Sequence, residues 1–358
     1  MIDSKTTITC VGDIAPIRTA QDHFMSDNQS LKKYFEEIFF ESDVVFCNLE
    51  TPLTRAKSVR ENKKYIFKAV PEIINAFPDQ FVYSIANNHI LDYGEEGLQE
   101  TIKHLSEKGI RFAGAGNNLQ EAVRPVVINC RGKSLGFLAC ADKRYQPATE
   151  NRPGIFPAIP DLLLPKISQL KSTVDLVVVS IHMGMEYIPV PAPVMIKLSN
   201  DCREAGADAV FFHHAHCVSG YTISKNGITL WGVGNFLFPD SSKNHFKPWF
   251  ETTTWSIIHE VNRGIIDLKI NPYIIDSDGI PKNADSKRGA RIRKRIELIS
   301  DKINHGDSLI WLRVKNICSY SYAKLFITNY ADIARRKGLL NMFKQITTSI
   351  QALFTEKS

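Results

Sequence analysis

The chain has 358 residues, 44% of them hydrophobic and 23% charged, which is ordinary for a globular protein and excludes a disordered or fibrous one. No apolar run reaches the roughly 18 residues of a membrane-spanning helix, and the N-terminus lacks the pattern of a secretory signal peptide. Seven cysteines without CxxC spacing indicate buried thiols in a reducing cytoplasm.

The first half of the chain alternates strand and helix patterns. Short apolar runs predict buried strands at Thr6–Val11, Asp43–Cys47, Phe81–Ala86 and Arg111–Ala115. Helical patterns are predicted at Leu31–Phe40, Pro71–Phe77 and Gly94–Lys108. Pro125–Cys130 and Ser134–Cys140 form a predicted hairpin.

The second half repeats this alternation. Helices are predicted at Leu162–Ser172 and Val194–Ala205, and strands at Asp175–Ile181 and Ala209–Phe212. Hairpins are predicted around Asn226-Gly227 and Arg263-Gly264. The mixture of βα units with hairpins predicts an α/β fold with mixed sheets and helices outside them.

Basic residues concentrate near the C-terminus. Residues 276–358 contain 16 Lys and Arg against 8 Asp and Glu. They include a basic helix predicted at Ser286–Ile303 and an amphipathic stretch at Leu339–Phe354. We expect a main domain over residues 1–305 and a helical basic extension over 306–358. A solvated basic face is one explanation, and contact with an anionic membrane surface or polymer is the other.

Five polar signatures follow apolar runs of the chain. They are Gly12-Asp13, Asn48-Leu49-Glu50, Asn87-Asn88-His89, His182 and His213-His214-Ala215-His216. Carboxylate, amide and imidazole groups at the carboxyl ends of strands are the ligand set of a two-metal hydrolytic site. Any one of them alone is more typical of a helix cap, a turn or a structural histidine.

Together these signatures predict a site for two divalent ions such as Mn²⁺, Fe or Zn²⁺. The expected ligands are Asp13, Glu50, Asn88, His182, His214 and His216. Glu50 is the expected bridging carboxylate, and His89 the expected proton-transfer residue. In extended backbone His214 and His216 would face one side and His213 the other. Asn87 is expected to fix its turn by hydrogen bonding.

The series of motifs resembles the CapA family of capsule synthesis and poly-γ-glutamate biosynthesis proteins. The resemblance rests on Gly-Asp, Asn-Leu-Glu, Ala-Asn-Asn-His, His-x-Gly-x-Glu, His-x-His and Gly-Asn-Phe, and it covers about residues 6–304. It implies a metallophosphatase-like fold, a four-layer α/β/β/α sandwich with the metals at the strand ends. Metallophosphatases carry Asp-x-His as their first motif, whereas this chain has Ala15 at the histidine position, and Glu50 replaces the second-motif aspartate.

The same resemblance suggests roles for residues around the ligands. Arg18 matches the arginine of the family's Gly-Asp-x-Met-Leu-Gly-Arg stretch and is expected to clamp a phosphate or carboxylate. Glu186 is expected to orient a ligand, and Asn235 to shape the turn beside the groove.

Three functions remain open from the sequence. The first is a metal-dependent hydrolase of phosphoesterase type, linked to capsule or poly-γ-glutamate biosynthesis. The second is a non-hydrolytic polymer-binding or assembly factor, and the third a binding module that has lost a metal. The expected partner is an anionic substrate, a phosphoester or acidic polymer, rather than a nucleic acid. The expected location is the cytoplasm, with peripheral contact at the inner membrane face through the tail. The substrate and the oligomeric state are not predicted.

Overall fold

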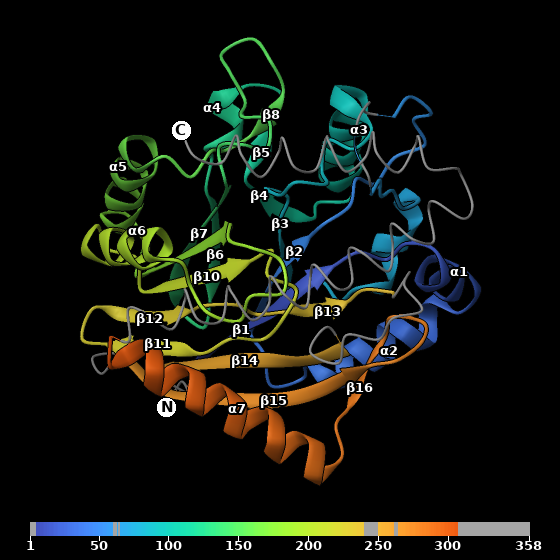
Figure 1. Ribbon diagram of the computed structural model, residues 1–358. Helices are drawn as coiled ribbons and strands as arrows, with labels where there is room; N and C mark the ends of the chain where they lie inside the picture. The colour runs from blue at the N-terminus through green and yellow to red at the C-terminus, as the bar shows by residue number, and fades with distance from the viewer. Residues whose placement is uncertain (1–4, 60–62, 64, 240–249, 261–263, 307–358) are drawn as a thin grey trace, which may run out of the picture. The chain divides into compact units, whose positions relative to one another are not determined.

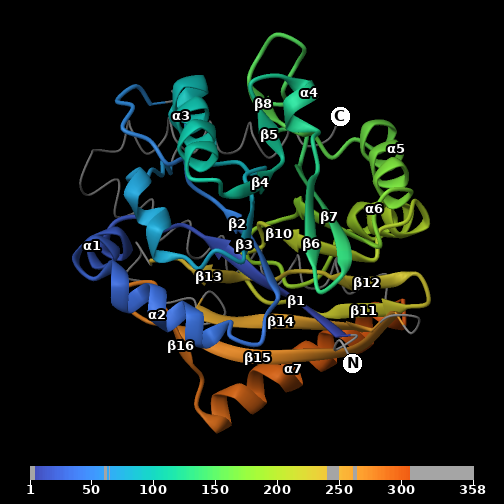
Figure 2. The ribbon, with the colours of Figure 1, turned by 180° about the vertical axis from the view of Figure 1, so that it is seen from behind.

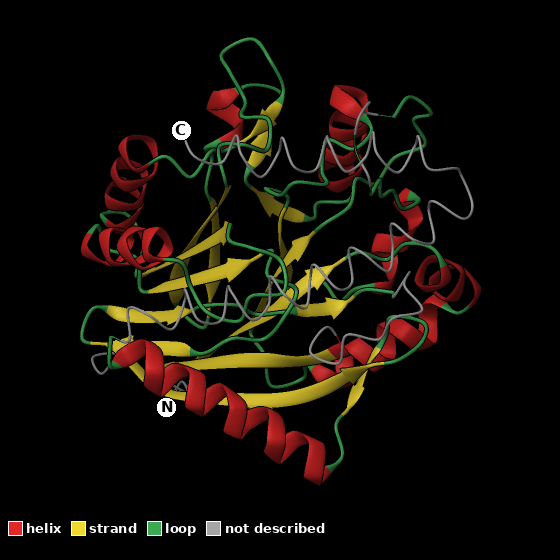
Figure 3. Ribbon diagram, viewed as in Figure 1, coloured by secondary structure: helices red, strands yellow, loops and turns green. Residues whose placement is uncertain are grey.

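Two β-sheets pack against each other, and helices flank them (Figures 1 and 3). The computed structural model describes residues 5–59, 63, 65–239, 250–260 and 264–306. The predicted extension over residues 306–358, apart from Gly306 itself, lies outside the described residues, as does the predicted stretch Leu339–Phe354. Among the described helices, none is long and apolar enough to cross a membrane.

The larger sheet has eight strands, of which β1 is the central one for the site. The path runs β16-β15-β14-β1-β2-β3-β4, and β13 also pairs with β1. β1, β2, β3 and β4 are parallel, whereas β14, β15 and β16 extend the sheet antiparallel. Its strands are β1 (Lys5–Ile14), β2 (Val44–Leu49), β3 (Phe81–Ser84), β4 (Arg111–Ala113), β13 (Asn235–Leu237), β14 (Glu251–Glu260), β15 (Gly264–Ile275) and β16 (Pro281–Asn283).

The smaller sheet has the order β11-β12-β10-β9-β7-β6, with four parallel strands between two antiparallel edges. Its strands are β6 (Val126–Cys130), β7 (Lys133–Ala141), β9 (Leu176–His182), β10 (Ala209–His213), β11 (Tyr221–Ser224) and β12 (Gly227–Leu230). A two-stranded pair joins β5 (Ala115–Gly116) to β8 (Gly154–Ile155).

Helices cover the outer faces of the sheets, and Figure 2 shows them from behind. They are α1 (Thr19–Ser26), α2 (Asn28–Ile38), the 3-10 helix η1 (Pro71–Ala76), α3 (Gly94–Glu107), α4 (Leu119–Ala122), α5 (Pro160–Lys171), α6 (Pro193–Glu204) and α7 (Ser286–Asn304). α5 and α6 pack on the smaller sheet, whereas α7 packs on β15 and β11. The predicted four-layer sandwich with two mixed sheets is confirmed.

The alternation of side chains along β9 shows how this strand is buried on both faces. Val177 and Val179 pack in the cluster that includes α5 and α6, whereas Val178 packs in the cluster between the sheets. In that inner layer Phe46 of β2 stacks on Phe137 of β7, with ring centroids 4.4 Å apart. Both sheets therefore contribute to one hydrophobic core, which fixes their parallel strand ends relative to each other.

A glycine allows β1 to approach β13 closely at the point where the site begins. A Cβ atom on Gly12 would lie 2.1 Å from the carbonyl oxygen of Gly234, so only glycine fits there. The next residue, Asp13, pairs in register with Asn235 and donates its backbone N–H to Gly234 at 2.9 Å. The Gly12-Asp13 signature is therefore explained by backbone packing as well as by the carboxylate.

Most predicted elements are confirmed within a few residues, and three differ. The predicted helix Leu31–Phe40 begins earlier, at Asn28, because the Asp27 side chain caps it by accepting from the Ser30 amide. The separate helix α1 was not predicted. Pro71–Phe77 is a 3-10 helix rather than an α-helix, and Arg111–Ala115 divides into β4 and β5 at Gly114, whose φ is 102°.

Candidate metal centre

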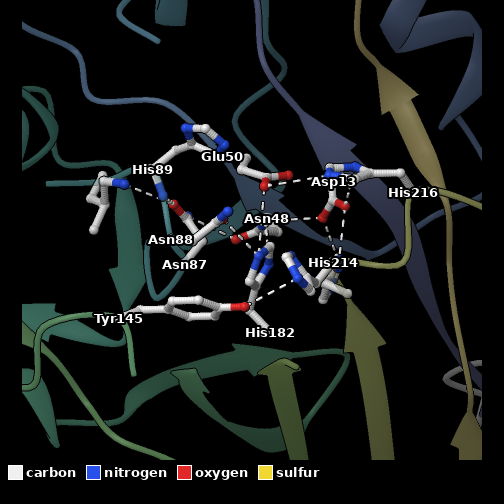
Figure 4. Close-up of polar contacts among 12 residues, drawn as sticks. Asp13, Asn48, Glu50, Asn87, Asn88, His89, Tyr145, His182, His214 and His216 are labelled. Carbon is white, nitrogen blue, oxygen red and sulfur yellow. Dashed lines mark hydrogen bonds and ion pairs between the residues drawn. The ribbon is translucent and has the colours of Figure 1, made fainter. Parts of the chain in front are cut away.

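The six expected metal ligands come together at the strand ends (Figure 4). Asp13 lies in β1 and Glu50 directly follows β2, whereas His182 ends β9 of the other sheet. Five of the six side chains are buried, and Asn88 is half-buried. The sequence therefore predicted which residues meet, while their roles as ligands stay a prediction.

Glu50 belongs to two groups of possible ligands. One group is Asp13, Glu50 and His182, and the other is Glu50, His214 and His216. Within each group the ligand atoms lie within 4.8 Å of one another. Oε1 of Glu50 is 3.6 Å from Nε2 of His182 and 3.8 Å from Nε2 of His216. This position suits a carboxylate shared by two cations.

The surroundings of Glu50 suit a carboxylate that binds a cation better than a carboxylate buried without one. Glu50 is fully buried, and neither carboxylate oxygen has a hydrogen-bond partner among the described residues. Burial, reinforced by the Asp13 charge, raises the pKa of Glu50 well above its usual value. An uncompensated buried carboxylate is costly unless it is paired or coordinates a metal. The donor set therefore fits a divalent ion.

Asp13 is held as a carboxylate by the histidines around it. Its Oδ1 accepts from Nδ2 of Asn48 and lies 2.9 Å from Nδ1 of His213. Its Oδ2 lies 3.4 Å from Nδ1 of His216. Burial alone would raise the pKa of Asp13, but hydrogen bonds from His213 and His216 hold it well below its usual range. His213 was expected to face away from the site, and it instead contacts Asp13.

The pKa values of His182 and His214 are lowered, whereas that of His216 is raised. Burial and the neighbouring His216 lower the pKa of His214 to about 3, and burial with His214 lowers that of His182 well below its usual value. Although burial opposes it, the charges of Glu50 and Asp13 raise the pKa of His216 to about 10. At neutral pH His182 and His214 are therefore neutral and keep a lone pair for a cation.

The backbone around the histidine cluster differs from the expected extended strand. β10 ends at His213, and His214 and His216 have φ angles of 85° and 53°, in the left-handed region. Both side chains reach the site because the chain turns there, so the argument from alternating side chains was wrong.

Asn87, Asn88 and His182 link the two sheets. Oδ1 of Asn87 accepts the backbone N–H groups of His89 and Ile90, at 3.0 and 2.9 Å, as expected for a residue that fixes its turn. Oδ1 of Asn88 lies 3.0 Å from Nε2 of His182. The Asn88 amide oxygen therefore stands beside the nitrogen of His182 that faces Glu50.

His89 is buried beside this cluster and has contacts of its own. Its Nδ1 is 2.7 Å from Oδ2 of Asp92 and 3.1 Å from Nζ of Lys63. Its ring stacks on Phe67, with centroids 3.9 Å apart. Burial, with an additional effect of Lys63, lowers the pKa of His89 to about 4 despite the hydrogen bond to Asp92. The ring is therefore neutral at pH 7, and Nδ1–H bonded to Asp92 makes Nε2 an acceptor.

The remaining expected residues lie around the cluster. The guanidinium carbon of Arg18 is 6.0 Å from the centre of the Phe67 ring, and the Arg18 backbone has a φ of 53°. Oδ1 of Asn235 lies 2.8 Å from Nδ1 of His216, so Asn235 contacts an expected ligand directly rather than only shaping a turn. Glu186 is half-buried and raises the pKa values of Glu50 and His216 by its charge.

Four contributing residues received no role from the sequence. Asn48 bridges Asp13 and Asn87 by hydrogen bonds of 2.9 and 3.1 Å. Asp92 and Lys63 contact His89, and the hydroxyl of Tyr145 lies 3.1 Å from Nε2 of His214. Asn48 belongs to one of the five polar signatures, and Asp92 lies three residues after His89, so both carried a local signal. Tyr145 and Lys63 carried none.

An α/β sandwich that buries two carboxylates among several imidazoles defines a candidate metalloprotein. The family model "Bacterial capsule synthesis protein PGA_cap" matches residues 7–240, so the chain belongs to this family. The capsule biosynthesis protein CapA of Bacillus anthracis is 29% identical over 334 residues, which cover 85% of this chain and 79% of that protein. The PGA biosynthesis protein CapA of Bacillus subtilis is 32% identical over 216 residues, 58% of this chain and 57% of that protein.

Solved structures with a similar chain path include nucleotidases. A 5'-nucleotidase from Candida albicans has a TM-score of 0.46 at 13% identity and covers 84% of this chain and 58% of its own. The NAD nucleotidase of Haemophilus influenzae has a TM-score of 0.45 at 10% identity, with 82% and 62% covered. Similarity at this level carries no information on activity.

Proposed function

We propose that this chain is a metal-dependent hydrolase of phosphoesterase type that works in the synthesis of a capsule or poly-γ-glutamate polymer. The observation that carries this proposal is Glu50, a buried carboxylate that belongs to both groups of possible ligands and whose two oxygens have no hydrogen-bond partner among the described residues. Family membership supports the link to capsule synthesis.

We propose two divalent ions, because the ligand groups are two and share one carboxylate. Asp13, Glu50 and His182 would hold one ion, with Asn88 beside them, and Glu50, His214 and His216 the other. A mixture of carboxylate and imidazole suits Mn²⁺, Fe or Zn²⁺. Such ions lower the pKa of water and neutralise charge that develops on a phosphoester.

The protein groups near the ions would bind the substrate and move a proton. Asp92 holds Nδ1 of His89, which leaves Nε2 as the atom at which a proton is exchanged with the reacting oxygen atoms. Arg18 is exposed and stands over Phe67, the ring that stacks on His89. We therefore assign Arg18 to binding an anionic group of the substrate. Glu186 and Asn235 are the proposed orienting groups.

The test combines metal content with turnover. Purified protein would be assayed for bound metal and for hydrolysis of phosphomonoesters and phosphodiesters in Mn²⁺, as wild type and as His89→Ala. The exposed His23→Ala is the matched control. We expect two equivalents of metal and at least a roughly 100-fold loss of turnover in His89→Ala alone. No metal, or no turnover by wild type, would remove the hydrolase proposal.

One feature favours a second function, binding of an acidic polymer. Lys287, Arg291 and Lys294 are exposed and lie one helical turn apart on α7, while Ile292 and Ile296 are buried beneath them. Poly-γ-glutamate should bind this stripe with an affinity that falls with salt. Arg291 also pairs with the buried Glu251, its Nη2 lying 2.7 Å from Oε1. Charge-reversal of Lys287 and Lys294, which keeps this pair, should therefore weaken binding without affecting phosphoester turnover, and an unchanged affinity would exclude this surface.

We place the protein in the cytoplasm, with the segment 306–358 as the proposed contact to the inner membrane face. The segment, apart from Gly306, lies outside the described residues, and its basic composition supports this assignment. Co-sedimentation of the full chain with anionic vesicles, compared with neutral ones, is the test. Equal recovery with both would contradict the assignment.

A further inference from the structure

We propose that Tyr145 is a positioning residue of the metal centre. Its hydroxyl oxygen accepts a hydrogen bond from Nε2–H of His214, which leaves Nδ1 of that ring as the nitrogen that binds a cation. This inference rests on the proposed metal centre. It goes beyond it by assigning a residue and a ligand atom.

The position of Tyr145 depends on contacts between neighbouring strands. Ala141 at the end of β7 pairs in register with His182 of β9, and the Asp142 amide donates to the His182 carbonyl at 3.0 Å. The amide of Tyr145 then donates to the Asp142 carbonyl at 3.0 Å, closing a turn. This turn brings the Tyr145 hydroxyl to 3.1 Å from Nε2 of His214 (Figure 4).

The Tyr145 ring is packed against two expected ligands. Its centroid lies 5.6 Å from that of His214 and 6.0 Å from that of His182, in tilted and edge arrangements. The Tyr145 hydroxyl is therefore held beside Nε2 of His214 by ring packing as well as by the hydrogen bond.

The unpartnered atom of His214 decides the direction of this hydrogen bond. A neutral imidazole carries one N–H, and Nδ1 of His214 is buried without a hydrogen-bond partner among the described residues. If Tyr145 donated to Nε2, the proton would sit on Nδ1 as a buried N–H with no acceptor in the described part of the chain. If Nε2–H donates to Tyr145, Nδ1 keeps a lone pair, and His214 is one of the three residues grouped with Glu50 and His216. Only the second arrangement gives His214 a ligand atom at this buried position.

His216 is held in the opposite way. Its Nδ1 lies 2.8 Å from Oδ1 of Asn235, and its Nε2 lies 3.8 Å from Oε1 of Glu50. The two histidines of the His-x-His motif therefore offer different nitrogens, each fixed by a different hydrogen-bond partner on the other side of the ring.

The experiment uses two independent readouts on the full chain. Long-range ¹H–¹⁵N spectra of the metal-free protein identify the His214 tautomer, with the signal assigned through His214→Gln. Calorimetric titration with Zn²⁺ then compares wild type with Tyr145→Phe. Tyr34→Phe is the control, because its hydroxyl donates to the Pro281 carbonyl at 2.6 Å, outside the cluster.

We expect wild-type His214 to carry its proton on Nε2 and Tyr145→Phe to show a mixture of tautomers. We also expect Tyr145→Phe to weaken one Zn²⁺ site about 10–100-fold and Tyr34→Phe to weaken neither. A wild-type proton on Nδ1, or equal Zn²⁺ affinity in Tyr145→Phe, would overturn the inference. Wild type that binds no Zn²⁺ would overturn the proposed metal centre instead, and the tautomer spectrum would still test the hydrogen bond.

Discussion

At the residue scale, Glu50 is the buried carboxylate of the cluster that lacks hydrogen bonds to both of its oxygens among the described residues. Native proteins leave few buried polar atoms without partners, and an unpaired carboxylate is among the most costly. Both Glu50 oxygens lack a hydrogen bond within the described part of the chain, and Oε1 is 3.6 and 3.8 Å from Nε2 of His182 and His216. Asp13, in the same cluster, is surrounded by donors. Burial of Glu50 therefore lowers the stability of the folded chain. Such a cost is expected of a residue retained for binding rather than for stability.

The first prediction follows from this difference between satisfied and unsatisfied carboxylates. In EDTA, Glu50→Gln should raise the free energy of unfolding by about 1–3 kcal/mol. Burial raises the pKa of Glu50 well above its usual value, so at neutral pH folding must bury its charge or take up a proton, and a neutral amide avoids both costs. The same variant should lose binding of added Zn²⁺. Urea denaturation followed by circular dichroism, with and without Zn²⁺, measures both effects.

The matched control is Glu121→Gln. Oε2 of Glu121 accepts from the backbone and side-chain nitrogens of Asn117 at 3.0 and 2.8 Å, so its charge is already satisfied. This variant should be no more stable than wild type, and it should keep its Zn²⁺ binding. If Glu50→Gln were destabilising in EDTA, the contacts of Oε1 with His182 and His216 would have to outweigh the cost of burying the carboxylate.

The sequence predicted which residues form the cluster better than it predicted their geometry. Polar groups after apolar runs identify strand ends, and strand ends of packed parallel sheets converge, so Asp13, Glu50 and His182 were found. The position of Tyr145 depends on the register of β7 against β9, which no local pattern encodes. The sequence also did not predict the left-handed backbone of His214 and His216, because a His-x-His spacing is equally compatible with a strand.

At the scale of elements, the close pairing of β1 with β13 positions two site residues at once. Asp13 and Asn235 are register partners, and Gly12 permits the approach. The sequence did not predict this pairing, because β13 is a short strand, Asn235–Leu237, and its partner β1 lies near the other end of the described chain. Longer elements such as α3 and β9 were predicted because their periodicity is carried by many residues.

The second prediction concerns Gly12. Gly12→Ala places a Cβ atom 2.1 Å from the Gly234 carbonyl oxygen, so the strands must separate. We expect a loss of about 3 kcal/mol or more in the free energy of unfolding, because overpacking against backbone relaxes poorly. Zn²⁺ affinity should fall as well, since Asp13 moves with the strand. Urea denaturation and calorimetric titration measure the two effects.

Gly109→Ala separates this effect from the general cost of replacing a glycine. Gly109 has a φ of 65°, and a Cβ atom added there would meet no atom of the described residues within 4 Å. Only backbone strain of about 1–2 kcal/mol is therefore expected. Its Zn²⁺ affinity should match that of wild type. Equal losses of stability in the two variants would show that the contact with Gly234 relaxes easily.

At the scale of the whole molecule, the candidate centre joins the two sheets of the sandwich. Asp13 and Glu50 come from the larger sheet, and His182 and His214 from the smaller one or its strand ends. A cation held by both would be lost whenever the sheets separate. Metal binding at this centre would therefore be coupled to the unfolding of the entire described unit rather than to a local segment.

The third prediction tests this coupling. Zn²⁺ or Mn²⁺ at about 100 times its dissociation constant should stabilise the folded chain by about 2.7 kcal/mol per ion, and EDTA should reverse the effect. Mg²⁺ at the same concentration should stabilise it less, because imidazole is a poor ligand for this ion. Scanning calorimetry should show one transition that moves to higher temperature as a whole. A transition that splits, with only part of it sensitive to metal, would mean that the ligands of one sheet alone hold the ion, and a transition unmoved by any of the three ions would argue against the centre itself.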